Sequence, residues 1–109
     1  MLILAHRGAS GYAPENTFAA FDVAVSMGAD GVETDVQLTG DGALVLLHDD
    51  TVDRTTDGHG LLVELTLEQV SRLDAGHWYG ELFGGERIPT LEAFLERYVG
   101  VLRLDLEIK

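Results

Sequence analysis

Apolar and polar positions follow one another in blocks that predict strands and helices in turn. The apolar run over residues 2–5 is typical of a short buried strand. The Gly-containing stretch over 6–14 predicts a loop, and the apolar positions after it recur at helical spacing, with Pro14 as the expected start of the helix. Residues 31–38 are rich in Val and Thr and predict a second strand.

The second half of the chain continues this alternation around a polar, turn-rich segment. The expected elements are a third strand over 43–47 after a Gly-Asp-Gly turn, a helix over 67–73 opened by a Thr66/Gln69 capping box, a helix after Thr90 and a strand over 102–107. Strands that alternate with helices indicate an α/β protein.

Two carboxylates lie on one face of the predicted strand over 31–38. Glu33 and Asp35 are two residues apart, so their side chains point the same way. Neighbouring carboxylates repel each other unless a cation lies between them, and oxygen ligands suit Mg²⁺ or Ca²⁺. A solvated strand face explains the pattern equally well, and for these two residues alone it is slightly favoured.

His48 closes the third predicted strand. If Gly40 and Asp41 form the turn, His48 lies opposite Glu33, and if the turn is one residue later, it lies opposite Asp35. Either antiparallel register puts the imidazole on the carboxylate face, where it could act as a general acid or base. The alternative is a histidine in a simple ion pair at a strand end.

Two further groups follow strand ends. Arg7, in the tripeptide after the first strand, could hold a phosphate, or could be an ordinary exposed loop residue. Glu107 and Lys109 lie on one face of the last predicted strand, as a third metal ligand and a phosphate contact. For this last pair alone, a plain charge pair is the better interpretation.

Composition limits the classes of function. The 109 residues allow one domain, the absence of cysteine excludes disulfides, and the net charge of −12 disfavours nucleic acid and acidic membranes as partners. No apolar stretch approaches the roughly 20 residues of a membrane span. We expect a cytoplasmic protein that binds a small molecule and neither enters a membrane nor binds nucleic acid.

The motifs resemble one family when they are taken together in chain order. The sequence closely resembles the glycerophosphodiester phosphodiesterases over essentially all 109 residues. The residues that carry this resemblance are His6-Arg7-Gly8, Pro14-Glu15-Asn16-Thr17, Glu33-Thr34-Asp35, His48-Asp49, Arg54-Thr55-Thr56, Leu73-Asp74-Ala75-Gly76, Glu86-Arg87-Ile88-Pro89-Thr90-Leu91 and Glu107-Ile108-Lys109.

The resemblance implies a fold, a reaction and a site. The fold is a TIM (β/α)8 barrel with a small insertion over 50–88, and the reaction is metal-dependent hydrolysis of glycerophosphodiesters to glycerol 3-phosphate and an alcohol. The attacking oxygen in this family can be the substrate's own glycerol 2-hydroxyl. The implied roles are Glu33, Asp35 and Glu107 as ligands of Mg²⁺ or Ca²⁺, His6 and His48 as the acid/base pair, and Arg7 and Lys109 as phosphate contacts.

Length separates this chain from that family. A TIM barrel typically has about 250 residues, so residues 1–109 are expected to form a single truncated domain with an incomplete barrel. Missing C-terminal chain or a second copy in a homo-oligomer would complete it. The alternatives are a non-catalytic metal- or phosphate-binding module, and a lipid phosphodiesterase of the related phospholipase D toxin type. The insertion and the absence of cysteine and of a secretion signal argue against the toxin type.

Overall fold

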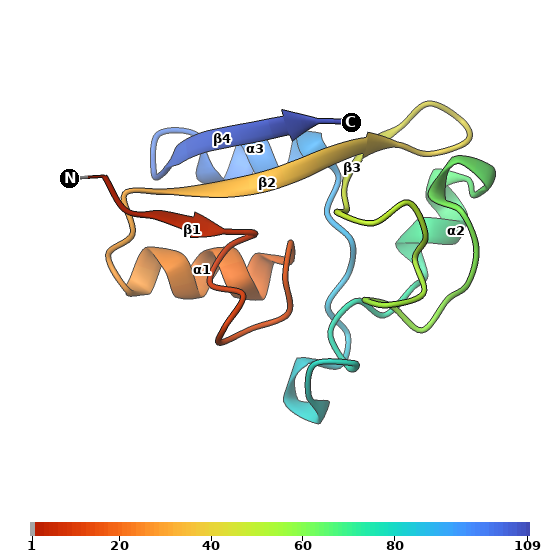
Figure 1. Ribbon diagram of the computed structural model, residues 1–109, viewed down its shortest axis with the longest axis horizontal. Helices are drawn as coiled ribbons and strands as arrows, with labels where there is room; N and C mark the ends of the chain where they lie inside the picture. Colours follow the sequence, from red (N-terminus) through yellow and green to blue (C-terminus); the bar gives the residue numbers. More distant parts are fainter. Residues whose placement is uncertain (1) are drawn as a thin grey trace.

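One long strand organises the sheet. The computed structural model describes residues 2–109. In it, β2 (Gly31–Leu38) pairs with each of the three remaining strands of a four-stranded sheet. β1 (Leu4–His6) and β4 (Arg103–Ile108) run parallel to β2, and β3 (Leu44–Leu46) runs antiparallel (Figure 1). The observed bounds of β2 are those predicted from its Val- and Thr-rich sequence.

The backbone hydrogen bonds of β2 assign each partner strand to an edge. The carbonyls of Glu33 and Asp35 accept from the amides of Arg7 and Leu47, at 2.6 and 3.1 Å. The carbonyl of Val36 accepts from the amide of Lys109 at 2.9 Å. Because successive carbonyls along a strand point to opposite edges, β1 and β3 follow one another along one edge, and β4 lies along the other.

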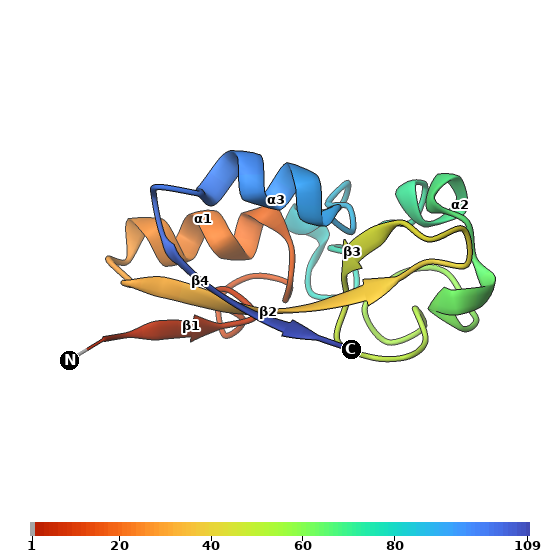
Figure 2. The same ribbon diagram turned by 90° about the horizontal axis from the view of Figure 1, so that it is seen from above.

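Two helices cover one face of this sheet (Figure 2). α1 (Phe18–Ser26) and α3 (Leu91–Tyr98) pack on the apolar residues that alternate along β2, and burial of this surface is the main stabilising term. The buried cluster consists of Phe21, Ala24, Val32, Val36, Leu46, Phe94, Tyr98 and Leu102. Within the part of the chain that the structure describes, the opposite face of the sheet carries no helix, and the four strands do not close on themselves.

The segment between β3 and α3 has its own small core. It contains two short 3₁₀ helices, η1 (Leu62–Glu64) and η2 (Glu81–Phe83), and the short helix α2 (Leu67–Ser71). Its buried cluster consists of Val45, Leu47, Val52, Leu62, Val70, Ala75 and Ile88. Because Val45 and Leu47 belong to the β3 segment, this second core is anchored directly on the sheet.

Helix ends follow the local sequence, with one exception. The Thr66/Gln69 capping box and the Thr90 cap are both present, as predicted. The predicted start of α1 at Pro14 is wrong, because Asn16 has a left-handed backbone (φ 56°) that no helix can include. The helix begins at Phe18, after Thr17 accepts a hydrogen bond from the Ala20 amide.

The predicted antiparallel hairpin is present, but both predicted registers are wrong. Val36 pairs with Leu46 and Leu38 with Leu44, so the loop contains one residue more than a two-residue turn. The Thr39 amide donates to the Ala43 carbonyl at 2.9 Å, and Gly42 has a φ of 85°, which is typical of a three-residue hairpin loop. This register alone would put His48 opposite Thr34, on the helix-covered face, but the strand ends at Leu46.

None of the helices within residues 2–109 is long and apolar enough to cross a membrane.

Candidate active site

The face of the sheet opposite the helices carries the predicted carboxylates. Glu33 and Asp35 lie on this face of β2, because the valines that flank them in the strand pack into the main core. The parallel register puts His6 of β1 beside Glu33, and Glu107 of β4 beside Asp35. Asp105 lies in the same row, beside Glu33. The strand order therefore gathers one imidazole and four carboxylates onto one surface.

His6 lies at the exposed end of this row. Its Nε2 atom is 3.4 Å from Glu33 Oε1, which makes an ion pair when the imidazole is protonated. Both side chains are accessible to solvent, with exposed fractions of 60% and 37%. His6 is thus held near a carboxylate while its ring stays open to a ligand.

Asp35 is the buried member of the row, with a side chain only 4% exposed. Its Oδ2 atom accepts a hydrogen bond from Asn16 Nδ2 at 3.2 Å and lies 3.6 Å from Arg7 Nε. Within residues 2–109, Arg7 Nε is buried without a hydrogen-bond partner. A buried carboxylate needs such partners, since the charged form is strongly destabilised by loss of water.

Arg7 and Asn16 share an uncommon backbone conformation. Both have a φ of 56°, and the Asn16 amide donates to the Arg7 carbonyl at 2.9 Å. Residues other than glycine adopt this left-handed conformation rarely, and they concentrate at functional sites. The bond between the two residues fixes the loop after β1 in the shape that turns Arg7 toward Asp35.

His48 is positioned by side chains that bind its backbone and the backbone of its neighbours. Pairing in the β2–β3 hairpin does not position it, because β3 ends at Leu46. The buried Gln37 donates from Nε2 to the carbonyls of Leu47, His48 and Asp49, at 2.7, 3.2 and 2.8 Å. Lys109 Nζ donates to the His48 carbonyl at 3.2 Å. These contacts hold the bend after β3 against the end of β4.

Asp49 orients the His48 ring. Its Oδ1 atom is 2.8 Å from His48 Nδ1, so the carboxylate favours the tautomer that carries the proton on Nδ1. Asp50, the next residue in the chain, makes no such contact within residues 2–109. Hydrogen bonds from Arg54, and to a lesser degree from His48, hold the pKa of Asp49 well below its usual range.

Arg54 joins this pair to the loop after β1. Its guanidinium makes two hydrogen bonds to Asp49, at 2.8 and 3.0 Å, and two to Glu15, at 2.8 and 3.1 Å. Glu15 Oε2 also accepts from Arg7 Nη1 at 3.3 Å. Hydrogen bonds to Asp49 and Glu15 raise the pKa of Arg54 above its ordinary value, so it is a permanent cation.

The carboxylates of Glu33, Asp35 and Glu107 suit a hard divalent cation, although their side chains do not converge on a common point in this structure. Among residues 2–109, no three His, Cys, Asp or Glu side chains converge on a point that could hold a metal. Glu33 turns to His6, and Asp35 turns to Asn16 and Arg7. Three carboxylates on neighbouring positions of one face are nevertheless the oxygen ligands that Mg²⁺ and Ca²⁺ prefer.

Several polar residues of the site were not selected from the sequence. Glu15, Asn16, Gln37, Arg54 and Asp105 lie in loops or on strand faces where a single sequence gives them no periodicity. The sequence feature that could have indicated Arg54 is the scarcity of positively charged residues. With only 7 Lys and Arg against 19 Asp and Glu, a basic residue in a turn-rich segment is an expected partner for buried acids.

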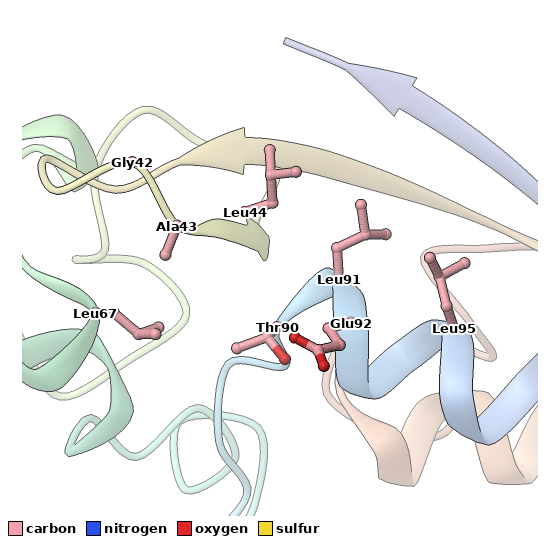
Figure 3. Close-up of a pocket in the computed structure, with 8 residues that line it drawn as sticks. All are labelled: Gly42, Ala43, Leu44, Leu67, Thr90, Leu91, Glu92 and Leu95. Atoms are coloured by element: carbon pink, nitrogen blue, oxygen red, sulfur yellow. The ribbon is translucent and has the colours of Figure 1, made fainter.

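A hollow of about 420 Å³ lies elsewhere on the molecule, beside the β2–β3 loop and α3 (Figure 3). Its lining is mostly apolar and includes Leu44, Leu91 and Leu95. None of the predicted site residues lines it. The candidate active site is therefore the carboxylate face of the sheet, and this hollow is separate from it.

Comparison with known proteins identifies this arrangement. The sequence model of the glycerophosphoryl diester phosphodiesterase family matches residues 6–109. YhdW of Bacillus subtilis (strain 168) is 62% identical over 109 residues, which are 100% of this chain and 45% of YhdW.

Two solved structures have the same fold. The crystal structure of the Agrobacterium tumefaciens str. C58 glycerophosphodiester phosphodiesterase superposes with a TM-score of 0.98 at 44% identity, covering 99% of this chain and 47% of that one. The Oleispira antarctica phosphodiesterase in complex with the product sn-glycerol-3-phosphate has a TM-score of 0.96 at 45% identity, covering 100% and 44%. The chain thus spans slightly less than half the length of these proteins and has the fold of part of a TIM barrel. It belongs to the glycerophosphoryl diester phosphodiesterase family.

Proposed function

We propose that this chain supplies the acid/base, phosphate-binding and metal-binding residues of a metal-dependent glycerophosphodiester phosphodiesterase. The observation that carries the proposal is the set of backbone hydrogen bonds on β2. They join the Arg7, Leu47 and Lys109 amides to carbonyls of residues 33–36, beside the Glu33 and Asp35 side chains. Imidazoles, cations and carboxylates thereby meet at one end of one sheet face, where α/β proteins form their sites.

The proposed substrate is a small glycerophosphodiester, cleaved to glycerol 3-phosphate and an alcohol. The Oleispira antarctica relative binds sn-glycerol-3-phosphate as product. In this chain, Arg7 and Lys109 would bind the phosphate, Arg7 through its guanidinium fork and Lys109 as a point charge. Because the chain has a net charge of −12, these two placed cations are needed to hold an anionic substrate.

His6 and His48 would move the two protons of the reaction. An oxygen nucleophile, either water or the substrate's glycerol 2-hydroxyl, forms a bond to phosphorus and loses its proton to one imidazole. The bond from phosphorus to the alcohol oxygen breaks, and the other imidazole gives that oxygen a proton. A cyclic phosphodiester formed by the 2-hydroxyl would then take up one water to give glycerol 3-phosphate. Exposure of both rings is consistent with contact with a substrate.

Glu33, Asp35 and Glu107 would hold the divalent cation, Mg²⁺ or Ca²⁺. When bound there, such an ion neutralises negative charge that develops on the phosphoryl oxygens. The carboxylates of this chain would turn inward from their present partners to do so. Asn16 and Arg7 contact the Asp35 carboxylate in its buried position, and both contacts would have to yield to the cation.

The same proposal covers the rest of the chain. Residues 1–109 would form a single truncated domain, in which the 50–88 segment is the insertion of the family type. A second copy or further chain would close the barrel. The protein would act in the cytoplasm on a small molecule, without nucleic acid partners and without insertion into a membrane.

The first test measures glycerol 3-phosphate released from glycerophosphocholine by the purified 109-residue chain, with Mg²⁺, with Ca²⁺ and with a chelator. Metal-dependent release is expected, and His6→Ala or His48→Ala should each lower kcat by about 100-fold or more, because general acid or base catalysis typically contributes 10²–10⁴-fold. His77→Ala is the matched control, since His77 is exposed in the 50–88 segment and contacts none of the site residues.

Release that survives both histidine substitutions would refute the assigned roles. A chain that binds Mg²⁺ or Ca²⁺ through Glu33 and Asp35 but releases no product would refute catalysis by this chain. It would instead identify a non-catalytic metal-binding module.

A further inference from the structure

Charges of alternating sign form a continuous chain of contacts across the site. It runs from Asp35 through Arg7, Glu15, Arg54 and Asp49, and its last contact is from Asp49 to the His48 ring. Arg54 occupies the centre, where it contacts two carboxylates that come from different parts of the chain. The contact between Arg54 and Glu15 spans 39 residues of sequence.

We propose that Arg54 is a positioning residue that holds the His48 imidazole through Asp49 and the Arg7 guanidinium through Glu15. The inference rests on the proposed function, because only that function gives His48 and Arg7 their roles. It assigns a part in the site to the 50–88 segment, which otherwise looks like a separate small core on β3.

The geometry distinguishes this contact from an ordinary surface ion pair. Exposed pairs usually contribute little, except where the geometry is bidentate or several charges form a network. The guanidinium of Arg54 is bidentate on both Asp49 and Glu15, and the Glu15 side chain is only 9% exposed. A planar five-donor fork suits two carboxylates in this way, whereas an ammonium does not.

The backbone that carries Arg54 is itself fixed. Val52 is fully buried in the second core, and its carbonyl accepts from the Thr56 amide at 3.1 Å and from the Thr56 hydroxyl at 2.6 Å. This turn sets the position from which the Arg54 side chain extends. A displacement of the turn would therefore move Asp49 and Glu15 together, and with them both groups that are proposed to touch the substrate.

The His48 tautomer provides a direct readout that needs no substrate. Nitrogen chemical shifts of the histidine rings in the ¹⁵N-labelled 109-residue chain, at about pH 8 where an ordinary imidazole is neutral, report which ring nitrogen carries the proton. Wild type is expected to show His48 protonated on Nδ1, as the 2.8 Å contact with Asp49 requires. Arg54→Gln should give a mixture with the Nε2-protonated form, which water favours, and Arg54→Lys should lie between the two.

The control variant is Arg72→Gln. Arg72 lies in the same segment, and its side chain is 74% exposed and paired only with Glu68 on its own helix. It should leave the His48 shifts as in wild type. Unchanged His48 shifts in a folded Arg54→Gln chain, judged by its backbone amide spectrum, would overturn the proposal.

Kinetics add a second, independent reading where the chain turns over substrate. Arg54→Gln should lower kcat by about 10–100-fold, the usual effect of losing a group that orients a site residue. Added to His48→Ala, it should cause little further loss in kcat, because the two residues act through one another. A fully additive loss would refute action through His48. An inactive wild-type chain with the expected tautomers would refute catalysis by this chain and leave the positioning role supported.

Discussion

Gln37 should contribute more to the free energy of unfolding than a single side-chain amide usually does. Its Nε2 group supplies two protons to three carbonyls, at 2.7, 2.8 and 3.2 Å. If Gln37 is replaced by Leu, the His48 carbonyl keeps the Lys109 ammonium, but the Leu47 and Asp49 carbonyls lose this partner. The substitution Gln37→Leu therefore removes the contacts that close the bend after β3, at nearly constant side-chain volume.

The expected cost follows from those two carbonyls. A buried polar group left without a partner costs about 1–3 kcal/mol, so two of them predict a loss of about 2–6 kcal/mol. That is a large part of a typical domain stability of about 5–15 kcal/mol. With a urea m-value of about 1 kcal/mol/M for a small protein, the unfolding midpoint should fall by about 2 M or more.

Urea unfolding followed by circular dichroism measures this difference. Gln69→Leu is the matched control, because Gln69 contributes to the exposed capping box of α2, whose loss costs roughly 1 kcal/mol. A Gln37→Leu midpoint no lower than that of Gln69→Leu would show that the three contacts contribute no more than about 1 kcal/mol, below the expected range. The account of how His48 is held in place would then be wrong.

Two other substitutions test the sheet and the charge chemistry of the 50–88 segment. A Cβ at Gly31 would lie 2.2 Å from the Arg103 carbonyl oxygen, so Gly31→Ala should destabilise the fold by about 1–3 kcal/mol or detach β4. Gly11→Ala is the control, because open space surrounds that position and no loss of stability is expected. Equal unfolding midpoints for the two variants would contradict the close approach of β2 and β4. Backbone hydrogen bonds from His77, Gly85 and Gly76 lower the pKa of Asp74 from 3.8 to about 2. A carboxylate whose pKa is lowered by folding stabilises the fold at pH values above its unfolded-state pKa, and this stabilisation is lost as the pH falls to the folded-state pKa. Asp74→Asn should therefore lower the free energy of unfolding at pH 7, and its difference from wild type should disappear between about pH 4 and pH 2. A gap independent of pH in denaturant titrations would exclude this carboxylate as the cause.

The parts of the fold that depend on neighbouring residues could be predicted from the sequence. β2 begins and ends where its Val- and Thr-rich run does, and the Thr66 and Thr90 caps act within three residues of themselves. The hairpin register could not be predicted, because loops of two and three residues both fit Gly40-Asp41-Gly42, and each added residue shifts the pairing by one. The left-handed Asn16 likewise gave no signal beyond a tolerance for that conformation.

The candidate site divides in the same way. Glu33 and Asp35 share one face of β2, as strand alternation predicts, and the parallel pairing puts His6 and Glu107 beside them. The roles assigned to these residues remain predictions. Apart from Asp49, its neighbour in the chain, the residues that hold His48 could not be found from the sequence, because Gln37, Arg54 and Glu15 come from segments whose approach depends on the whole fold.

The strands that pair along the two edges of β2 lie at different distances from it in the sequence. β3 follows β2 through a short loop and β1 is joined to it through the single helix α1, but β4 pairs with β2 only after the much longer 39–102 segment, and the Lys109–His48 contact closes 61 residues. Contacts across long loops form late, because the closure entropy must be overcome first. Transient release of β4 would remove Glu107 and Lys109 together while leaving His6 and His48 on their edge. One ligand of the proposed cation site and one of its two phosphate contacts would therefore be lost as one unit, before the fold as a whole unravels.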